Sequence, residues 1–104
     1  MNALIIKEVI NIAKDMLENK IDIVKASDLI SSYHYDLDPD WNDSDLTRFW
    51  VISDDFSYYS IPPELMEENY RHKQMLAREE LLAICTPEAI MAAENIIRKY
   101  KDLP

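Results

Sequence analysis

Acidic side chains are concentrated in the middle of this chain. Residues 36–55 contain seven aspartates and one base, Arg48, so they carry −6 of the net charge of −9. Most of the aromatic residues lie in or beside this segment, between residues 33 and 59. Carboxylates mixed with exposed tyrosine and tryptophan are typical of protein surfaces that bind lysine and arginine. The segment is therefore the first candidate for a binding surface, and a plain solvated acidic loop is the alternative.

Metal and acid–base chemistry are also suggested by the run Asp36-x-Asp38-x-Asp40. It resembles the start of a calcium-binding EF-hand loop. In such a loop the sixth residue is glycine and the twelfth is glutamate, but Trp41 and Thr47 stand at those positions. We therefore expect no metal site, no cofactor and no catalytic residue, and the chain is not predicted to be an enzyme.

The remaining candidates for chemistry are two histidines and one cysteine. His34 and His72 are far apart in sequence, and neither belongs to a metal-binding motif. His34 is expected to be a surface residue of a loop, and pairing of its imidazole with a nearby aspartate is the alternative. Cys85 follows an apolar helical run, so a buried thiol is expected. Its place before a predicted helix start leaves a reactive thiol as the alternative.

Composition sets the fold class. The 104 residues include no glycine, although average usage predicts roughly seven. Glycine-rich phosphate loops are therefore excluded, and tight hairpins are disfavoured. A hydrophobic content of 48% and a charged content of 30% are typical of a globular protein. We expect one all-α domain over residues 1–104.

Other features bear on partners and compartment. A net charge of −9 opposes direct binding of nucleic acid. A single cysteine excludes an internal disulfide, and the apolar run near the N-terminus is too short for a signal or membrane segment. These features predict a cytoplasmic protein that does not enter the membrane; its oligomeric state is left open.

Helical periodicity and capping residues predict a compact bundle of four to five helices with an irregular acidic middle segment. The first helix covers residues 3–19, and Asp22 caps a second that ends at Tyr33. Residues 34–45 and 53–63 are expected to be irregular, with a short helix between them that Asp43 or Ser44 caps. A long helix is expected from Pro63 to Ile84, and a last one is expected to begin at Thr86-Pro87-Glu88. The apolar positions that should face inward on these last two helices are Leu65, Tyr70, Leu76, Leu82, Ala83, Ile90, Ala93, Ile97 and Tyr100.

Two resemblances bear on function. The stretch from Asp45 to Pro62 resembles a pattern, roughly D-F-x-x-F-x-x-I-D-S-E-T-D-x-L-P, in a family of short uncharacterised bacterial helical proteins. That resemblance implies a small, soluble interaction protein. The run Asp55-Phe-Ser-Tyr58-Tyr59-Ser is similar to the D-x-x-Y-Y-P motif of acidic helical immunity proteins that neutralise nuclease bacteriocins. In that motif the aspartate and the tyrosine pair bind the toxin, and here Ser60 replaces the proline.

Together these features predict a bacterial immunity protein of the bacteriocin or contact-dependent growth inhibition type. Such a protein would bind a basic toxin domain, for example a nuclease, through an acidic and aromatic surface. The alternative is a non-catalytic adaptor or regulatory subunit that docks on a host enzyme through the same face. The predicted partner-binding residues are Asp54, Asp55, Tyr58 and Tyr59, supported by Asp36, Asp38, Asp40, Trp41, Asp43 and Asp45.

Overall fold

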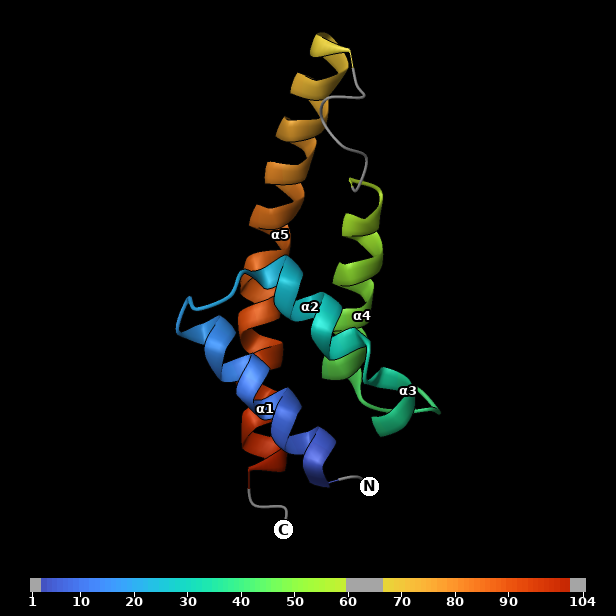
Figure 1. The fold of residues 1–104 in the computed structure, drawn as a ribbon, viewed down its shortest axis with the longest axis vertical. Coiled ribbons are helices and arrows are strands. Elements are labelled where there is room, and N and C mark those ends of the chain that lie inside the picture. The colour runs from blue at the N-terminus through green and yellow to red at the C-terminus, as the bar shows by residue number, and fades with distance from the viewer. Residues whose placement is uncertain (1–2, 60–66, 102–104) are drawn as a thin grey trace.

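Helices are the regular elements of the part of the chain that the structure describes. A computed structural model describes residues 3–59 and 67–101. Over these residues there are five helices and no strand (Figure 1), and the all-α prediction is confirmed. The helices are α1 (Ala3–Leu17), α2 (Ile23–Ser31), α3 (His34–Leu37), α4 (Ser44–Ser57) and α5 (Glu68–Tyr100). None of the helices in these ranges is both long enough and apolar enough to cross a bilayer.

Four helices enclose one hydrophobic core. Helix α4 lies beside α5, while α1 packs on α5 and α2 packs on α4 (Figure 1). The largest fully buried side chains come from different helices and meet at the centre of this arrangement. They include Val9, Ile30, Leu46, Phe49, Ile52 and Ile96. Burial of such side chains is the main favourable term that holds the helices together.

The first two helices follow the sequence closely. Asp22 caps α2, and its carboxylate accepts a hydrogen bond from the amide of Lys25 at 2.7 Å. Asn19 has a φ of 61° just after α1. This left-handed conformation usually takes glycine at the end of a helix, and asparagine is the best common substitute. A chain without glycine therefore ends α1 with asparagine.

The middle of the chain is more helical than predicted. Residues His34–Leu37 form the short helix α3 inside the predicted loop. Asp43 caps α4 as expected, but α4 continues to Ser57, so residues 53–57 were wrongly predicted to be irregular. The reason is that Phe56 lies seven residues after Phe49 and enters the same core. Burying this side chain outweighs the low helix propensity of the serines and aspartates around it. Residues 60–63 lie outside the described residues.

The C-terminal half contains one long helix where two were predicted. Helix α5 runs without interruption through Pro87. The Thr86 hydroxyl donates to the Leu82 carbonyl at 2.6 Å inside the helix, so it does not cap a new one. Proline has no N–H to give to the Ala83 carbonyl, but the helix continues because the residues after it pack into the core. These buried residues are Ala89, Ala92, Ala93 and Ile96.

The inward face predicted for α5 is correct in part. Ala93 is buried, and Leu82, Ile97 and Tyr100 pack against the core. Tyr70, Leu76, Ala83 and Ile90 are exposed, which contradicts the prediction. They are exposed because α5 extends beyond α1 and α2 (Figure 1) and because its buried stripe runs through Cys85 and Ala89. The predicted helix start at Pro63 and the side chain of Leu65 lie outside the described residues.

Pro87→Ala is expected to raise the free energy of unfolding by about 1–3 kcal/mol, because proline inside a helix costs about 3 kcal/mol relative to alanine. Pro87 is exposed, so the change removes little packing. Urea unfolding followed by circular dichroism measures the difference. Glu94→Ala, at an exposed position on the same helix, is the matched control and should change stability little. A loss of stability in Pro87→Ala would show that proline is needed at this point of α5.

Candidate functional site

The outer face of α4 carries aromatic and acidic side chains in one row. Trp50, Asp54 and Tyr58 follow at intervals of four residues, and this spacing places them along one side of the helix and its C-cap. The opposite side of α4 is the buried stripe of Leu46, Phe49, Ile52 and Phe56. Trp50 is 40% exposed and Tyr58 is 74% exposed. The α4 row therefore faces solvent along its length.

The loop before α4 extends this row. Trp41 is 50% exposed, and its ring meets that of Trp50 edge to face, with centroids 5.1 Å apart. On its other side Trp41 lies against His34, with ring centroids 3.9 Å apart. Tyr35, on α3, is 81% exposed. We call the combined surface the acidic–aromatic ridge. Its members are Tyr35, Asp36, Asp40, Trp41, Trp50, Asp54 and Tyr58.

The carboxylates of the ridge are available to a partner. Asp36, Asp40 and Asp54 are exposed. Within residues 3–59 and 67–101 their side chains form no hydrogen bond or ion pair. An exposed carboxylate without a partner is hydrated and loses no internal contact when it binds an arginine or a lysine.

His34 lies beneath the exposed part of the ridge, against the ring of Trp41. It is buried, and its Nε2 lies 3.3 Å from the Thr47 hydroxyl and 3.9 Å from a carboxylate oxygen of Asp38. The expectation of a surface loop residue is therefore wrong. The alternative, a histidine paired with a nearby aspartate, describes His34 better. Asp38 is also buried and accepts hydrogen bonds from the amides of Asn42 and Asp43, at 2.8 and 2.7 Å. These contacts fix the loop that presents Trp41.

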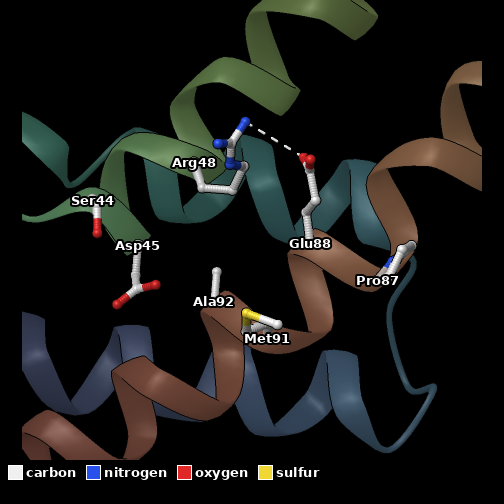
Figure 2. A pocket seen from close by; sticks show the side chains of 7 residues that line it. All are labelled: Ser44, Asp45, Arg48, Pro87, Glu88, Met91 and Ala92. Atoms are coloured by element: carbon white, nitrogen blue, oxygen red, sulfur yellow. Dashed lines mark ion pairs between the residues drawn. The ribbon is translucent and has the colours of Figure 1, made fainter.

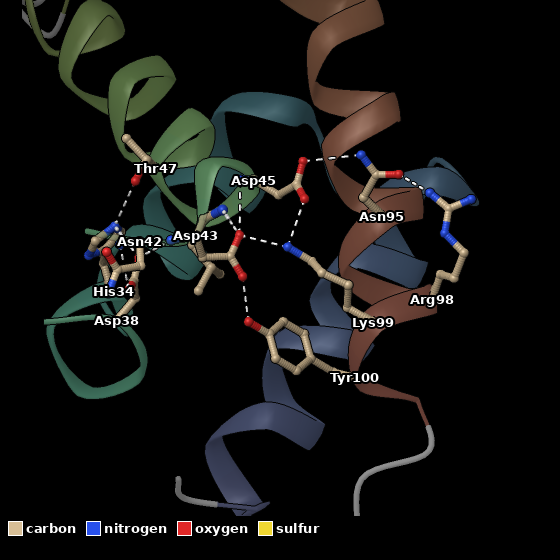
Figure 3. Close-up of polar contacts among 11 residues, drawn as sticks. His34, Asp38, Asn42, Asp43, Asp45, Thr47, Asn95, Arg98, Lys99 and Tyr100 are labelled. Atoms are coloured by element: carbon tan, nitrogen blue, oxygen red, sulfur yellow. Dashed lines mark hydrogen bonds and ion pairs between the residues drawn. The ribbon is translucent and has the colours of Figure 1, made fainter. Parts of the chain in front are cut away.

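Asp43 and Asp45 bind the C-terminal end of α5 (Figure 3). Lys99 Nζ lies 2.8 Å from a carboxylate oxygen of each aspartate. The Tyr100 hydroxyl donates to Asp43, and the Asn95 side-chain amide donates to Asp45 at 3.2 Å. Asp43 also accepts from the amides of Asp45 and Leu46 as the N-cap of α4. We call this group of side chains the Asp43 network, and it joins the start of α4 to the end of α5.

The ionisation of these groups follows from their contacts. Burial alone would raise the pKa of Asp43, but hydrogen bonds from Lys99, Tyr100 and the Leu46 amide outweigh it and hold that pKa below the usual value. Burial opposes the charge of Lys99, yet its bonds to both aspartates raise its pKa. The pKa of Tyr100 is raised by burial and by the adjacent Asp43 carboxylate. The network therefore keeps a charged Asp43 and Lys99 and a neutral Tyr100.

The predicted motif of Asp55, Tyr58 and Tyr59 is divided between two surfaces. Tyr58 belongs to the ridge, whereas Tyr59 packs against Phe56, with ring centroids 6.3 Å apart. Asp55 lies on the side of α4 that faces α5, close enough to Cys85 to influence its pKa. Asp55 and Tyr59 therefore border the ridge and do not lie on its outer face.

Cys85 is buried, as expected. Burial raises the pKa of its thiol, and the Glu88 and Asp55 carboxylates raise it further. The alternative of a reactive thiol assumed a helix N-terminus at this point. Helix α5 is continuous there, so that assumption is wrong. The thiol remains protonated at neutral pH and serves as a small apolar side chain.

Arg48 is the one base of the acidic segment, and it points away from the ridge. Its guanidinium lies 3.4 Å from the Glu88 carboxylate across a shallow groove of about 310 Å³ between α4 and α5 (Figure 2). Met91 and Ala92 also line this groove. In the described residues no three histidine, cysteine or acidic side chains come together as metal ligands would. Arg48 therefore does not neutralise the negative charge of the ridge.

Sequence patterns located the segment but missed two of its exposed aromatics, Tyr35 and Trp50. The signal for Trp50 was its adjacency to Phe49, because neighbouring side chains on a helix point about 100° apart and two large rings at such positions seldom share one buried stripe. No comparable signal was available for Tyr35, since α3 was predicted to be a loop. Comparison with models of known families, with curated proteins and with solved structures finds no match for this chain.

Proposed function

We propose that this chain is an immunity protein that binds a basic toxin domain through the acidic–aromatic ridge. The observation that carries the proposal is the exposed Trp41–Trp50 pair with the unpaired carboxylates of Asp36, Asp40 and Asp54 around it. The few residues that dominate binding energy at protein interfaces are enriched in tryptophan and tyrosine. Carboxylates beside them select lysine and arginine and speed the encounter with a basic partner.

A nuclease is the toxin class that fits this chemistry best. A nuclease must be basic where it holds the phosphates of its substrate. A protein with an acidic ridge and a net charge of −9 covers such a surface and excludes the nucleic acid without catalysis. Under this proposal the protein acts in the cytoplasm, where it meets a toxin that has entered the cell.

The proposal assigns different roles to the ten predicted residues. Among the ten predicted residues, the ridge presents Asp36, Asp40, Trp41, Asp54 and Tyr58 to solvent. Asp38, Asp43 and Asp45 accept hydrogen bonds inside the protein, so they position the ridge and contribute charge at a distance. Asp55 and Tyr59 stand at its border.

The test uses a basic toxin domain encoded next to the gene for this chain, with binding measured by calorimetry at low and physiological salt. The double variant Asp54→Asn with Tyr58→Ala is expected to bind at least about 30-fold more weakly, because one interface anchor is worth about 2 kcal/mol or more. Tyr70→Ala with Glu94→Gln removes an exposed tyrosine and an exposed acid from α5 and is the matched control. It should bind like the wild type.

Two results would overturn the proposal. One is the absence of binding at low salt, where attraction between opposite charges is strongest. The other is equal affinity of the double variant and the wild type. Capture of a host enzyme through Trp41 and Tyr58, with no toxin bound, would instead support the adaptor alternative.

A further inference from the structure

Helix α5 extends well beyond the helices that pack on it. Its 33 residues span about 50 Å at 1.5 Å per residue. This length accounts for the longest dimension of the molecule, 52 Å. Side chains of α5 pack against the core from Leu81 onward, so the half that begins at Glu68 projects past α1 and α2 (Figure 1). The projecting half therefore has a long side that α1 and α2 leave uncovered.

Apolar side chains repeat along one exposed side of α5. Leu76, Ala83 and Ile90 are spaced seven residues apart, and Leu76 and Ile90 are 53% and 39% exposed. A seven-residue repeat places side chains on one face at steps of about 10.5 Å and is the spacing of helix-to-helix seams. The small central Ala83 permits close approach of another helix. We call these three residues the α5 seam.

The α5 seam is symmetric about Ala83. If a second copy of α5 lies antiparallel with the two Ala83 residues together, Leu76 of each copy packs on Ile90 of the other. The same alignment places the acid Glu68 opposite the base Arg98. One surface thus complements itself in both shape and charge, which is the condition for a two-fold dimer.

The distribution of charge along the chain also favours α5 as the surface where two copies meet. Residues 68–100 contain five acids and five bases, so the whole net charge of −9 lies outside this helix. Two copies that meet through the acidic–aromatic ridge bring their like charges together, whereas two that meet through α5 keep those charges apart. Beside Ile90, the turn between α1 and α2 and helix α5 form a groove of about 410 Å³. The groove leaves room for a partner side chain at this end of the seam.

From the palindromic spacing and the neutral charge we infer that the chain forms a two-fold dimer, in which the α5 seams of two copies pack antiparallel around Ala83. The dimer leaves both acidic–aromatic ridges exposed, because each ridge lies on α3, the loop that follows it, and α4. Dimerisation is therefore separate from the proposed immunity function, and either one can fail without the other.

Sedimentation equilibrium tests the dimer. The wild type is expected to show twice the mass of one chain, and Ala83→Arg is expected to show the mass of one chain with unchanged circular dichroism. Ile84→Arg is the matched control, because Ile84 is exposed but lies about 100° away around the helix. It should keep the dimer mass. A wild type that stays monomeric over the whole concentration range would overturn the inference.

Engineered disulfides test the antiparallel arrangement. Ala83→Cys should form a covalent dimer under mild oxidation, because the two-fold axis brings the paired Cα atoms within the disulfide range of about 4–7 Å. Met91→Cys and Ile84→Cys lie off the seam and should not cross-link. The wild type, whose one cysteine is the buried Cys85, measures the background level of cross-linking. Equal cross-linking of Ala83→Cys and Ile84→Cys would rule out the proposed packing.

Discussion

Phe49→Ala is expected to lower the free energy of unfolding by about 4 kcal/mol, because loss of a buried phenylalanine leaves a cavity and removes its burial. Phe49 is fully buried in the core, to which α1, α2, α4 and α5 all contribute. Domains of this size are stable by only about 5–15 kcal/mol, so the variant should be close to unfolding. Urea unfolding followed by circular dichroism measures the change.

Trp50→Ala is the matched control for this prediction, since it removes an aromatic ring from the adjacent position. Trp50 faces solvent and meets Trp41 edge to face. Its loss should cost about 1 kcal/mol of stability, the size of one aromatic pair. Equal destabilisation by the two variants would contradict the assignment of Phe49 to the core and Trp50 to the ridge.

Local signals predicted the first half of the fold well. The apolar periodicity of α1 and the cap residues Asp22 and Asp43 act within a few residues of their positions, so sequence spacing is enough to find them. The all-α class followed from the same signals and from the absence of glycine. Asn19 shows how this chain ends a helix without glycine.

Tertiary packing decided the elements that sequence patterns missed. Phe56 extends α4 because it reaches the core, and Ala92 and Ile96 carry α5 past Pro87 because they are buried in the same core. Serine, aspartate and proline near these points favour loops in isolation. The energy of burial is larger than those local preferences, and it depends on partners distant in sequence.

Sequence patterns predicted which segment carries the candidate site, but not which residues of that segment share one surface. Composition shows that residues 36–55 are acidic, yet it does not show that Asp43 and Asp45 are held by Lys99, more than fifty residues later. Helical spacing could have separated Tyr58 from its neighbour Tyr59, about 100° away around the helix, if α4 had been extended to Ser57. An error in the length of one helix therefore placed residues of two different faces in one site.

Asp43→Ala is expected to lower the free energy of unfolding by about 2–3 kcal/mol. The change removes the N-cap of α4, worth about 1 kcal/mol. It also removes charge-assisted hydrogen bonds with Lys99 and Tyr100, each worth up to about 1.5–3 kcal/mol when buried. Lys99 is partly exposed and becomes hydrated when its partner is lost, so the sum is discounted. Asp54→Asn, at an exposed position on the same helix, is the control and should change stability by less than about 0.5 kcal/mol.

Asp43→Asn distinguishes the contribution of the N-cap to stability from the contribution of the Asp43 charge. Asparagine caps helices as well as aspartate does, so this variant should keep the cap and lose only the charged contacts with Lys99 and Tyr100. The pKa of Asp43 is lowered in the folded protein. Its carboxylate therefore stabilises the fold at pH values above the ordinary pKa of aspartate. That contribution is lost as the pH falls through the lowered folded-state pKa.

The stability difference between the wild type and Asp43→Asn should therefore be constant near neutral pH and shrink below about pH 4. Unfolding curves in urea at several pH values between 2 and 7 measure it, and Asp54→Asn again serves as the control because its side chain has no internal partner among the described residues. A difference at pH 2 as large as that at pH 7 would mean that the charge of Asp43 does not add to stability. A constant difference at all pH values would thus remove the ion pair with Lys99 from the account of how α4 and α5 are joined.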